Sequence, residues 1–422
     1  TNALYTGGNI QIGAKVVNGT AVGNALVIDS ATTSWATTTN ALYNNNGTLY
    51  WNGVAISSNA TGTSFMPVLY NESSRNGQAG LAFIYKSQIY TFGYAITGTP
   101  FSPYGFEGTS ANTPKLAPVV NAPNGWNEIA AAPTSICALS NVGTVYCMGE
   151  NGNGQLGLGD TTDRLQFEKL TFPGNAGLIT KIYSVTNDGG SGTNTGESFY
   201  AIDANGRVFA WGYNGYGQLG NGNTTNATSP VQTGSGVWSG KVITKLAVGN
   251  QDQTHVAAID STGQLYMWGR NDQGQLGLGD TTNRNTPTVV PGFTNVTDAV
   301  LAGTYDAAAY RQFTRILKTD GTTWAAGDNT QGQLADGSNT DRLSFVQSTG
   351  ISNVQKIFAG SSYQGGWSGA IDASGYVYFA GRNGQGEFGL GDTSSRNAWQ
   401  APSGSFQGKV VKVVATGDSA TN

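Results

Sequence analysis

The sequence has few charged side chains. Charged residues make up 11% of the 422 residues, and 21 Lys and Arg against 25 Asp and Glu leave a formal net charge of −4. A typical soluble domain has about 25% charged residues. There is no cluster of basic residues, which excludes proteins that hold nucleic acid by neutralising its phosphates. There is also no run of about 18 apolar residues, so no membrane insertion is predicted. We expect a neutral surface of amides and hydroxyls, as on secreted or virion-surface proteins.

Histidine, the commonest general base in enzymes, occurs only once, at His255. A catalytic triad also needs a nucleophile and an orienting group, and the sequence has no Gly-x-Ser-x-Gly elbow and no reactive-cysteine motif. Glycosidases need only two carboxylates, so the sequence alone leaves that chemistry open. Most aspartates, however, fall in repeated turns. We therefore predict that the protein is not an enzyme and has no catalytic, cofactor-binding or metal-binding residues.

Cysteine occurs twice, at Cys137 and Cys147. The pair flanks the predicted turn at 141–143 symmetrically, so a hairpin there would place the two residues directly opposite each other on one face. A cross-hairpin disulfide fits this spacing. Two buried thiols that pack as small apolar side chains fit it equally well. The redox compartment therefore does not follow from the cysteines.

Glycine is abundant, at 62 residues, and much of it belongs to one repeated motif. The motif first reads Gly149-Glu-Asn-Gly-Asn-Gly-Gln-Leu-Gly-Leu-Gly-Asp160. It returns from Gly212, Gly269, Gly327 and Gly381, at spacings of 63, 57, 58 and 54 residues. Regular self-similarity with such a period indicates a repeat architecture.

Each repeat predicts four β-strands. An apolar strand, a variable loop, a second strand, a tight turn and a third strand lead to the Gly-rich loop, and an outer strand such as 286–291 follows it. The tight turns end in glycine, as in Ser261-Thr-Gly263, because a three-residue hairpin loop needs a residue with positive φ. The first strands are expected to begin near Phe65, Trp126, Thr180, Ile243, Val296, Val354 and Val410.

The Gly-Gln-Leu-Gly loops and this strand order resemble the regulator-of-chromosome-condensation repeat family over roughly residues 65 to 422. The resemblance implies an all-β fold in which residues 61–422 form a seven-bladed β-propeller of four-stranded blades, with the last blade incomplete at Asn422. Six blades with the final strand as a clasp are the alternative. The resemblance also implies that His255 makes a structural hydrogen bond at the head of a second strand. The nucleotide-exchange activity of the chromatin-bound family member is not expected, because the chain lacks a basic tail and has a pI near 5.0.

The Gly-rich loops are interpreted as architecture. A phosphate-binding loop precedes a helix, whereas these loops precede strands and occur five times. Glycine permits close backbone approach between blades, and the apolar residue after Gln is expected to fill the core between them. Asp160 and Asp280 open turns that we expect them to cap, without calcium. The structural repeat positions are Gly154, Leu156, Gly217, Leu219, Gly274, Leu276, Gly332, Leu334, Gly386 and Phe388.

Residues 1–60 differ from the rest of the chain. Lys15 and Asp29 are their only charged residues, and they have too few large apolar side chains for a robust core of their own. The piece Leu49-Tyr-Trp-Asn-Gly53 resembles the short β-rich neck segments of bacteriophage tail fibres. This resemblance implies an attachment or oligomerisation segment, with a homotrimer favoured, and an N-terminal arm on a monomer is the alternative. The start at Thr1, without methionine or a signal-peptide pattern, predicts a processed or partial chain.

Recognition is expected on the propeller face that carries the Gly-rich loops. In antiparallel blades, the loops after the first and third strands share this face, and the irregular connections 186–197, 249–254, 303–312 and 360–369 are predicted there. Variable loops on a rigid scaffold commonly carry binding. Aromatic side chains among amides suit a glycan or a protein surface. The candidate receptor-binding residues are Tyr213, Tyr216, Tyr305, Tyr310, Tyr363 and Trp367.

The sequence favours a virion-surface tail-fibre or receptor-binding structural protein. Its propeller would recognise a glycan or protein receptor on a host surface, and residues 1–60 would join it to other virion or fibre proteins. The alternative is a secreted, extracellular propeller that binds or inhibits a protein partner, similar to the bacterial propellers that inhibit β-lactamases. Neither function requires nucleic acid or a cofactor.

Overall fold

The computed structural model describes most of the chain from residue 125 onward and isolated strands before it. The described residues are 10–17, 20–28, 41–45, 48–51, 54–57, 66–72, 78–85, 88–93, 117–118, 125–132, 134–187, 196–234, 236–249, 254–306, 309–362 and 365–401. These residues are strands, turns and loops, and none of them forms a helix long and apolar enough to cross a membrane.

Among the residues described, six four-stranded antiparallel sheets follow one another, and we call them blades I to VI. Blade I contains β6 (Met66–Glu72), β7 (Gln78–Tyr85), β8 (Gln88–Gly93) and β9 (Ala117–Pro118). Blade II contains β10 (Trp126–Ala131), β11 (Ser135–Ser140), β12 (Val145–Gly149) and β13 (Arg164–Lys169). Blade III contains β14 (Ile179–Asn187), β15 (Gly196–Asp203), β16 (Val208–Gly212) and β17 (Ala227–Gln232).

The remaining three blades have the same strand order. Blade IV contains β18 (Ile243–Val248), β19 (His255–Asp260), β20 (Leu265–Gly269) and β21 (Arg284–Val289). Blade V contains β22 (Val296–Asp306), β23 (Ala309–Lys318), β24 (Thr323–Gly327) and β25 (Arg342–Gln347). Blade VI contains β26 (Val354–Ser362), β27 (Gly365–Asp372), β28 (Val377–Gly381) and β29 (Arg396–Gln400). The predicted four-strand unit is therefore confirmed.

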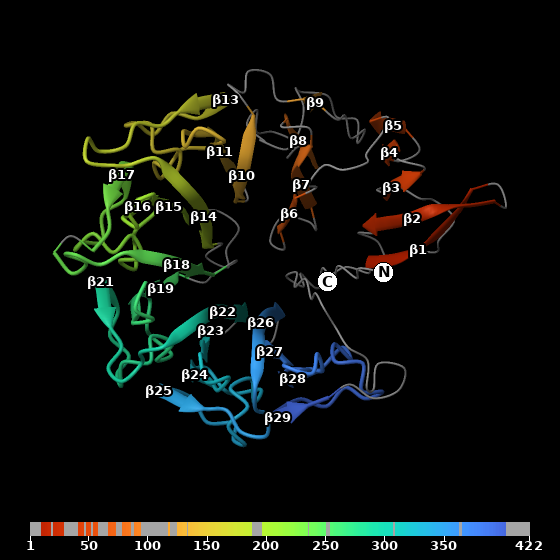
Figure 1. The fold of residues 1–422 in the computed structure, drawn as a ribbon, viewed down its shortest axis with the longest axis vertical. Coiled ribbons are helices and arrows are strands. Elements are labelled where there is room, and N and C mark those ends of the chain that lie inside the picture. The colour runs from red at the N-terminus through yellow and green to blue at the C-terminus, as the bar shows by residue number, and fades with distance from the viewer. Residues whose placement is uncertain are drawn as a thin grey trace.

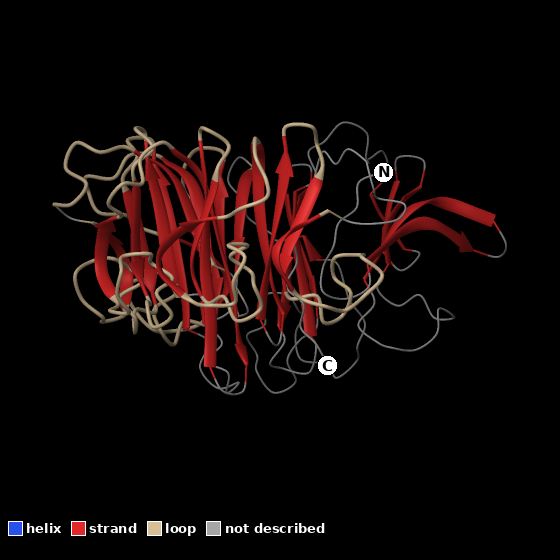
Figure 2. Ribbon diagram, turned by 90° about the horizontal axis from the view of Figure 1, so that it is seen from below, coloured by secondary structure: helices blue, strands red, loops and turns tan. Residues whose placement is uncertain are grey.

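The blades are arranged around a common centre, with each first strand inside and each fourth strand at the periphery (Figure 1). The first strands β6, β10, β14, β18, β22 and β26 begin within one residue of the predicted positions. Figure 2 shows that the strands run between two loop-bearing faces. The all-β propeller fold is confirmed, whereas seven blades stay a prediction, because the strand expected at Val410 lies outside the described residues.

The hydrophobic core lies between neighbouring blades. The second strands β11 and β19 are buried at every position, whereas the outer strand β13 is largely exposed. One buried cluster joins blades II and III through Leu139, Phe199 and Trp211. A second cluster joins blades III and IV through Tyr200 and Trp268. A sheet that is apolar on both faces must be covered on both sides, and in this ring each blade covers the next.

The tight turns between second and third strands have the predicted glycine geometry. Gly206 and Gly263 have φ values of 73° and 80°, in the left-handed region that is open to glycine at little cost. A Cβ atom at Gly263 would also stand 2.9 Å from Asn295 Cα. The turn prediction is confirmed.

Cys137 and Cys147 are directly paired on β11 and β12, as the hairpin predicted, and they form a disulfide. Both side chains are completely buried in the cluster between blades II and III. Of the two alternatives, a disulfide and two buried thiols, the structure has the disulfide.

The described part of the N-terminal segment forms a sheet of its own. Its strands are β1 (Ile10–Val17), β2 (Thr20–Ile28), β3 (Ala41–Asn45), β4 (Thr48–Trp51) and β5 (Val54–Ser57), in sequential antiparallel order. In Figure 1 this red sheet lies beside the ring, on the side between blades I and VI.

Candidate functional site

The face with the Gly-rich loops, which we call the loop face, includes five loops of equal length in the described part of the chain. These are residues 150–163, 213–226, 270–283, 328–341 and 382–395, each between the third and fourth strands of a blade. The opposite face, with the short turns and the links between blades, is called the turn face. The shared length and conformation make the loop face a regular frame, on which the positions that vary become distinctive.

A buried asparagine holds each Gly-rich loop in shape. In blade IV, Asn271 Oδ1 accepts a 2.9 Å hydrogen bond from Leu276 N, and Asn271 Nδ2 donates to Asp280 O at 2.9 Å. The same residue in the other loops is Asn151, Asn214, Asn329 and Asn383, and all five are completely buried. The repeated sequence did not predict this role, although asparagine stands two residues after the opening glycine in every copy.

The glycine before the Gln, or before Glu387 in the fifth loop, brings four of the five loops against the outer strand of the next blade. A Cβ atom at Gly154 would lie 2.7 Å from Thr228 Cα, and one at Gly217 would lie 2.7 Å from Asn285 Cα. Gly274 and Gly332 approach Leu343 and Asn397 in the same way. Gly386 has a φ of 77°, but a Cβ atom there would meet only Asp392 O, at 3.8 Å. Close interblade approach is therefore confirmed for four of the five glycines.

The apolar residue after Gln is buried in each loop. Leu156, Leu219, Leu276 and Leu334 are completely buried, and Phe388 is 2% exposed. Leu156 lies in the cluster between blades II and III, and Leu219 lies in the one between blades III and IV. The Gln backbone carbonyl also joins blades, because Trp211 Nε1 donates to Gln155 O at 3.0 Å. The expected burial of these side chains is therefore observed.

One position in each loop carries residues that differ in charge and size. The first residue after the strand-three glycine is Glu150, Tyr213, Arg270, Asp328 or Arg382. Its backbone N–H donates to a carbonyl near the start of the second strand or directly before it, for example Tyr213 N to Glu197 O at 2.9 Å. We call these five residues the variable ring. Charged residues beside the repeated Asn of each loop are the sequence signal that could have identified the four charged members.

Within this ring, Tyr213 belongs to an aromatic and cationic cluster that spans two blades. The rings of Tyr213 and Tyr216 are T-shaped, with centroids 6.5 Å apart. Arg270 Cζ from the next blade lies 4.7 Å from the centroid of Tyr216, and Arg270 Nε donates to Asp272 Oδ2 at 2.9 Å. Burial raises the pKa of Tyr213 above its ordinary value near 10, which is already far above pH 7. The structure thus brings together two of the six predicted aromatic residues.

Tyr213 is held in place by two glycines. A Cβ atom at Gly196 would lie 2.6 Å from Tyr213 Cδ1, and one at Gly215 would lie 2.2 Å from its hydroxyl oxygen. The Tyr213 and Tyr216 side chains are both half-buried. This partly covered, rigid aromatic pair offers contact area without a large loss of side-chain entropy.

The prediction for Trp367 was wrong. This residue lies in β27 and is only 7% exposed, with its ring among Phe358, Phe379 and Phe388. The polar and Gly-rich sequence 360–369 was interpreted as a loop, but β26 and β27 continue through it, since Gly360 pairs with Trp367 and Ser362 pairs with Gly365. Backbone pairing does not require apolar side chains, so composition alone did not reveal the strand.

The predicted loop 303–312 is likewise mostly strand. Tyr305 on β22 pairs with Tyr310 on β23, and Asp306 pairs with Ala309. The side chains of Tyr305 and Tyr310 lie outside the described part of the structure, as does the whole of Tyr363. β14 and β15 similarly shorten the predicted connection 186–197.

Beneath the variable ring, buried polar side chains join neighbouring blades. Glu197 Oε1 on β15 accepts hydrogen bonds from Thr134 N at 2.6 Å and Thr134 Oγ1 at 3.0 Å, and Ser135 Oγ donates to Glu197 Oε2. Burial raises the pKa of Glu197 to about 8, against the opposing effect of these hydrogen bonds. The carboxyl group is therefore protonated near pH 7 and acts as a structural link.

His255 makes a structural hydrogen bond, as the family resemblance implied, and this bond joins two blades. Its Nε2 lies 2.9 Å from Thr314 Oγ1 in blade V, and Thr314 Oγ1 in turn donates to Gln275 O at 2.8 Å. Burial lowers the pKa of His255 to about 3, so the imidazole is neutral near pH 7. These contacts give His255 a structural role.

The aspartates of the Asp-Thr-Thr turns cap those turns. Thr162 N donates to Asp160 Oδ1 at 2.9 Å, and Arg164 Nη2 pairs with Asp160 Oδ2 at 2.7 Å. Asp280 has the same contacts with Thr282 and Arg284. The capping prediction is confirmed. Over the residues that the structure describes, no group of three His, Cys, Asp or Glu side chains could hold a metal ion.

Comparisons with known proteins agree with the repeat geometry. Residues 142–179, 205–258 and 262–308 match the regulator of chromosome condensation (RCC1) repeat. The Arabidopsis thaliana ultraviolet-B receptor UVR8 is 29% identical over 272 residues, which cover 64% of this chain and 56% of the receptor. The human E3 ubiquitin-protein ligase HERC2 is 32% identical over 232 residues, which cover 53% of this chain but 4% of the ligase. The chain thus spans about half of the receptor and a small part of the ligase.

Solved structures show the same fold. Human WBSCR16 has a TM-score of 0.60 at 16% identity, and the match covers 88% of each chain. Yeast RCC1 (Prp20), solved with Kap60 bound, has a TM-score of 0.56 at 18% identity, over 77% of this chain and 73% of that one. The chain therefore carries regulator-of-chromosome-condensation repeats and folds as an RCC1-like β-propeller.

Proposed function

We propose that this protein is a non-enzymatic propeller that recognises a protein partner through its loop face. The observation that carries the proposal is the cluster of Tyr213, Tyr216 and Arg270, at loop positions whose residues differ between blades. Tyr and Arg are enriched among the residues that dominate binding energy in protein interfaces. The pair is half-buried and rigid, so its ordering costs little entropy when a partner binds.

The relatives support a protein partner. UVR8 is named a receptor, yeast RCC1 was solved with Kap60 bound, and a second yeast structure is described with binding to Gsp1p and histones. Three charged members of the variable ring, Arg270, Asp328 and Arg382, are buried and form ion pairs with Asp272, Arg311 and Glu387. A face whose charges are largely paired suits a protein surface more than a polyanion.

Site-specific photocrosslinking tests this proposal. A photoreactive phenylalanine analogue replaces Tyr216 on the loop face, and in a matched control it replaces Leu178, which is 67% exposed on the turn face. The expected result in extracts of the source organism is one protein adduct from position 216 and none from position 178. Adducts at both positions, or at neither, would argue against loop-face recognition of a protein. Retention on a glycan array without a protein adduct would favour a glycan receptor.

The virion-surface fibre stays a second prediction, with a secreted protein as the alternative location. The observation in its favour is that β1 to β5 form a sheet of their own, which suits an attachment segment. The comparisons give it no support. The full chain should form a trimer in mass photometry, and a chain that starts at residue 61 should be a monomer. A monomeric full chain would remove the basis for this role.

A further inference from the structure

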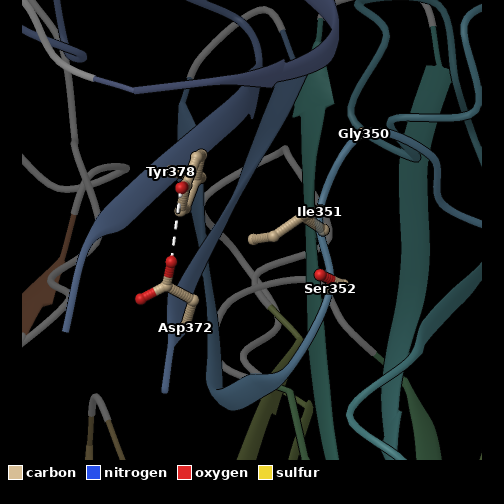
Figure 3. Close-up of a pocket in the computed structure, with 5 residues that line it drawn as sticks. All are labelled: Gly350, Ile351, Ser352, Asp372 and Tyr378. Atoms are coloured by element: carbon tan, nitrogen blue, oxygen red, sulfur yellow. Dashed lines mark hydrogen bonds between the residues drawn. The ribbon is translucent and has the colours of Figure 1, made fainter. Parts of the chain in front are cut away.

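The turn face of blade VI has a cavity where neighbouring blades have an aromatic ring. The cavity has a volume of about 320 Å³ and is lined by Gly350, Ile351, Ser352, Asp372 and Tyr378. Figure 3 shows the Ile351 side chain extending from its loop toward the space beside Tyr378 and Asp372. Residues 348–353 form the link from β25 to β26.

The repeats show what normally occupies this place. In blades III, IV and V, the link before the first strand supplies an aromatic ring that meets the third-strand residue equivalent to Tyr378 edge to face. The ring centroids are 5.5 Å apart for Phe172 and Phe209 and 6.1 Å apart for Trp238 and Tyr266. In blade V the distance between Phe293 and Trp324 is 5.4 Å. Blade VI has Ile351 in its link instead of an aromatic residue.

A length difference does not explain the missing ring. The blade V link, residues 290–295, is six residues long, and so is the blade VI link, residues 348–353. The difference is the side chain, since Phe293 covers Trp324 whereas Ile351 leaves the edge of Tyr378 open. An aromatic ring therefore fits the geometry of this position.

A second group is also missing in blade VI. Asp203 and Asp260 end the second strands of blades III and IV, and each meets a cation: Arg207 Nη2 lies 2.8 Å from Asp203 Oδ2, and Lys241 Nζ lies 3.7 Å from Asp260 Oδ2. Tyr266 Oη also donates to Asp260 Oδ2, at 3.2 Å.

In blade VI, Asp372 Oδ1 caps its turn by accepting from Ser374 N and Tyr376 N, both at 2.9 Å. Asp372 Oδ2 accepts from Tyr378 Oη at 3.3 Å. Across the described residues, no cationic side chain lies within ion-pair distance of Asp372. Its Oδ2 atom therefore faces the cavity with a polar partner but without a compensating charge.

We propose that this cavity binds an aromatic ring that carries a nearby ammonium group. The ring packs against Tyr378 and Ile351, in the place of Phe293 and Trp238, and the ammonium group donates to Asp372 Oδ2, in the place of Lys241. A free aromatic amine has this chemistry, and so does a tryptophan beside a lysine in a partner protein. The site is on the face opposite the variable ring, so it does not depend on the proposed loop-face function.

The test is titration calorimetry of the full-length protein with tryptamine and with an acetylated Lys-Trp dipeptide amide. Butylamine lacks the ring, and indole-3-propionate lacks the positive charge, so both serve as control probes. Binding of tryptamine or the dipeptide, with at least about tenfold weaker binding of both controls, is expected from the loss of one charged hydrogen bond or one ring contact. Tryptamine alone would identify a free amine, and the dipeptide alone would identify a protein segment.

Two variants locate the binding. Ile351→Phe supplies the ring that blade V has, and it should abolish binding and raise the melting temperature. Asp372→Asn keeps the turn cap but removes the charge, and it should weaken binding by about tenfold or more. Failure of both probes to bind the wild type would overturn the proposal. Binding that persists unchanged in Ile351→Phe and Asp372→Asn would overturn it too.

Discussion

Glu197 on β15 accepts a 2.6 Å hydrogen bond from the backbone N–H of Thr134, and this contact joins blades III and II beneath the variable ring. The carboxyl group is completely buried. It links the propeller core to the face where recognition is proposed, because Tyr213 N donates to Glu197 O. Its burial has a measurable consequence for the dependence of stability on pH.

Glu197→Gln should remove a loss of stability at alkaline pH. The folded-state pKa of Glu197 is raised from 4.5 to about 8, so its contribution is complete below pH 4.5 and decreases as the pH rises toward 8. Each pH unit in this window lowers the unfolding free energy by up to about 1.4 kcal/mol. In urea unfolding between pH 6.5 and 8, the wild type should lose about 2 kcal/mol and the Gln variant should lose little. Parallel pH curves for the two proteins would contradict a buried, neutral Glu197.

His255→Gln should have the opposite effect. The folded-state pKa of His255 is lowered from 6.5 to about 3, so its contribution is complete above pH 6.5 and is lost as the pH falls toward 3. Between pH 4.5 and 6.5 the effects of Glu197 and His255 nearly cancel in the wild type. The His255→Gln protein should therefore become more stable as the pH decreases from 6.5 to 4.5, by on the order of 2 kcal/mol. An unchanged pH profile would show that His255 titrates normally.

The sequence predicted the frame of the propeller because the frame repeats. First-strand starts such as Ile243 and Val354, the positive-φ glycines and the interblade leucines were all visible in five motif copies. Trp367 and Tyr310 were misplaced in loops, because the length of a strand pair depends on backbone pairing that glycine and serine permit equally well.

The candidate site was predictable only in part. Tyr213 and Tyr216 were identified as aromatic residues on the loop face, but Arg270 was not, because its contact with Tyr216 crosses from one blade to the next. No local pattern encodes such a contact. The absence of an aromatic ring beside Tyr378 could not be predicted from the sequence either. It follows from the strand register, which makes Tyr378 equivalent to Trp324 and so allows the preceding links to be compared.

Asn271→Ala should destabilise the protein strongly. It leaves the buried Leu276 N without its acceptor and removes the donor from Asp280 O. Loss of such buried hydrogen bonds costs about 2–4 kcal/mol in unfolding free energy. Asn285→Ala is the control, because Asn285 is exposed and donates a single hydrogen bond, to Gly222 O. Urea midpoints that shift equally in the two variants would contradict the role assigned to the asparagine.

The Cys137–Cys147 disulfide should be detectable in the purified protein. Under denaturing conditions without reductant, iodoacetamide should label neither cysteine, and after reduction it should label both, as read by mass spectrometry. Replacement of both residues by alanine should lower the unfolding free energy by about 2–4 kcal/mol. Complete labelling without reductant would show that two buried thiols, and no bond, occupy this hairpin.

The most direct test of the central claim is the affinity for the partner captured at position 216, measured for matched variants on the two faces. Tyr216→Ala removes the ring on which Arg270 stacks, and Leu178→Ser changes an exposed side chain on the turn face. We predict that Tyr216→Ala weakens binding by about 30-fold or more, as for an interface hot spot, while Leu178→Ser leaves the Kd unchanged. Equal affinities for the wild type and Tyr216→Ala, or a loss confined to Leu178→Ser, would contradict recognition by the loop face.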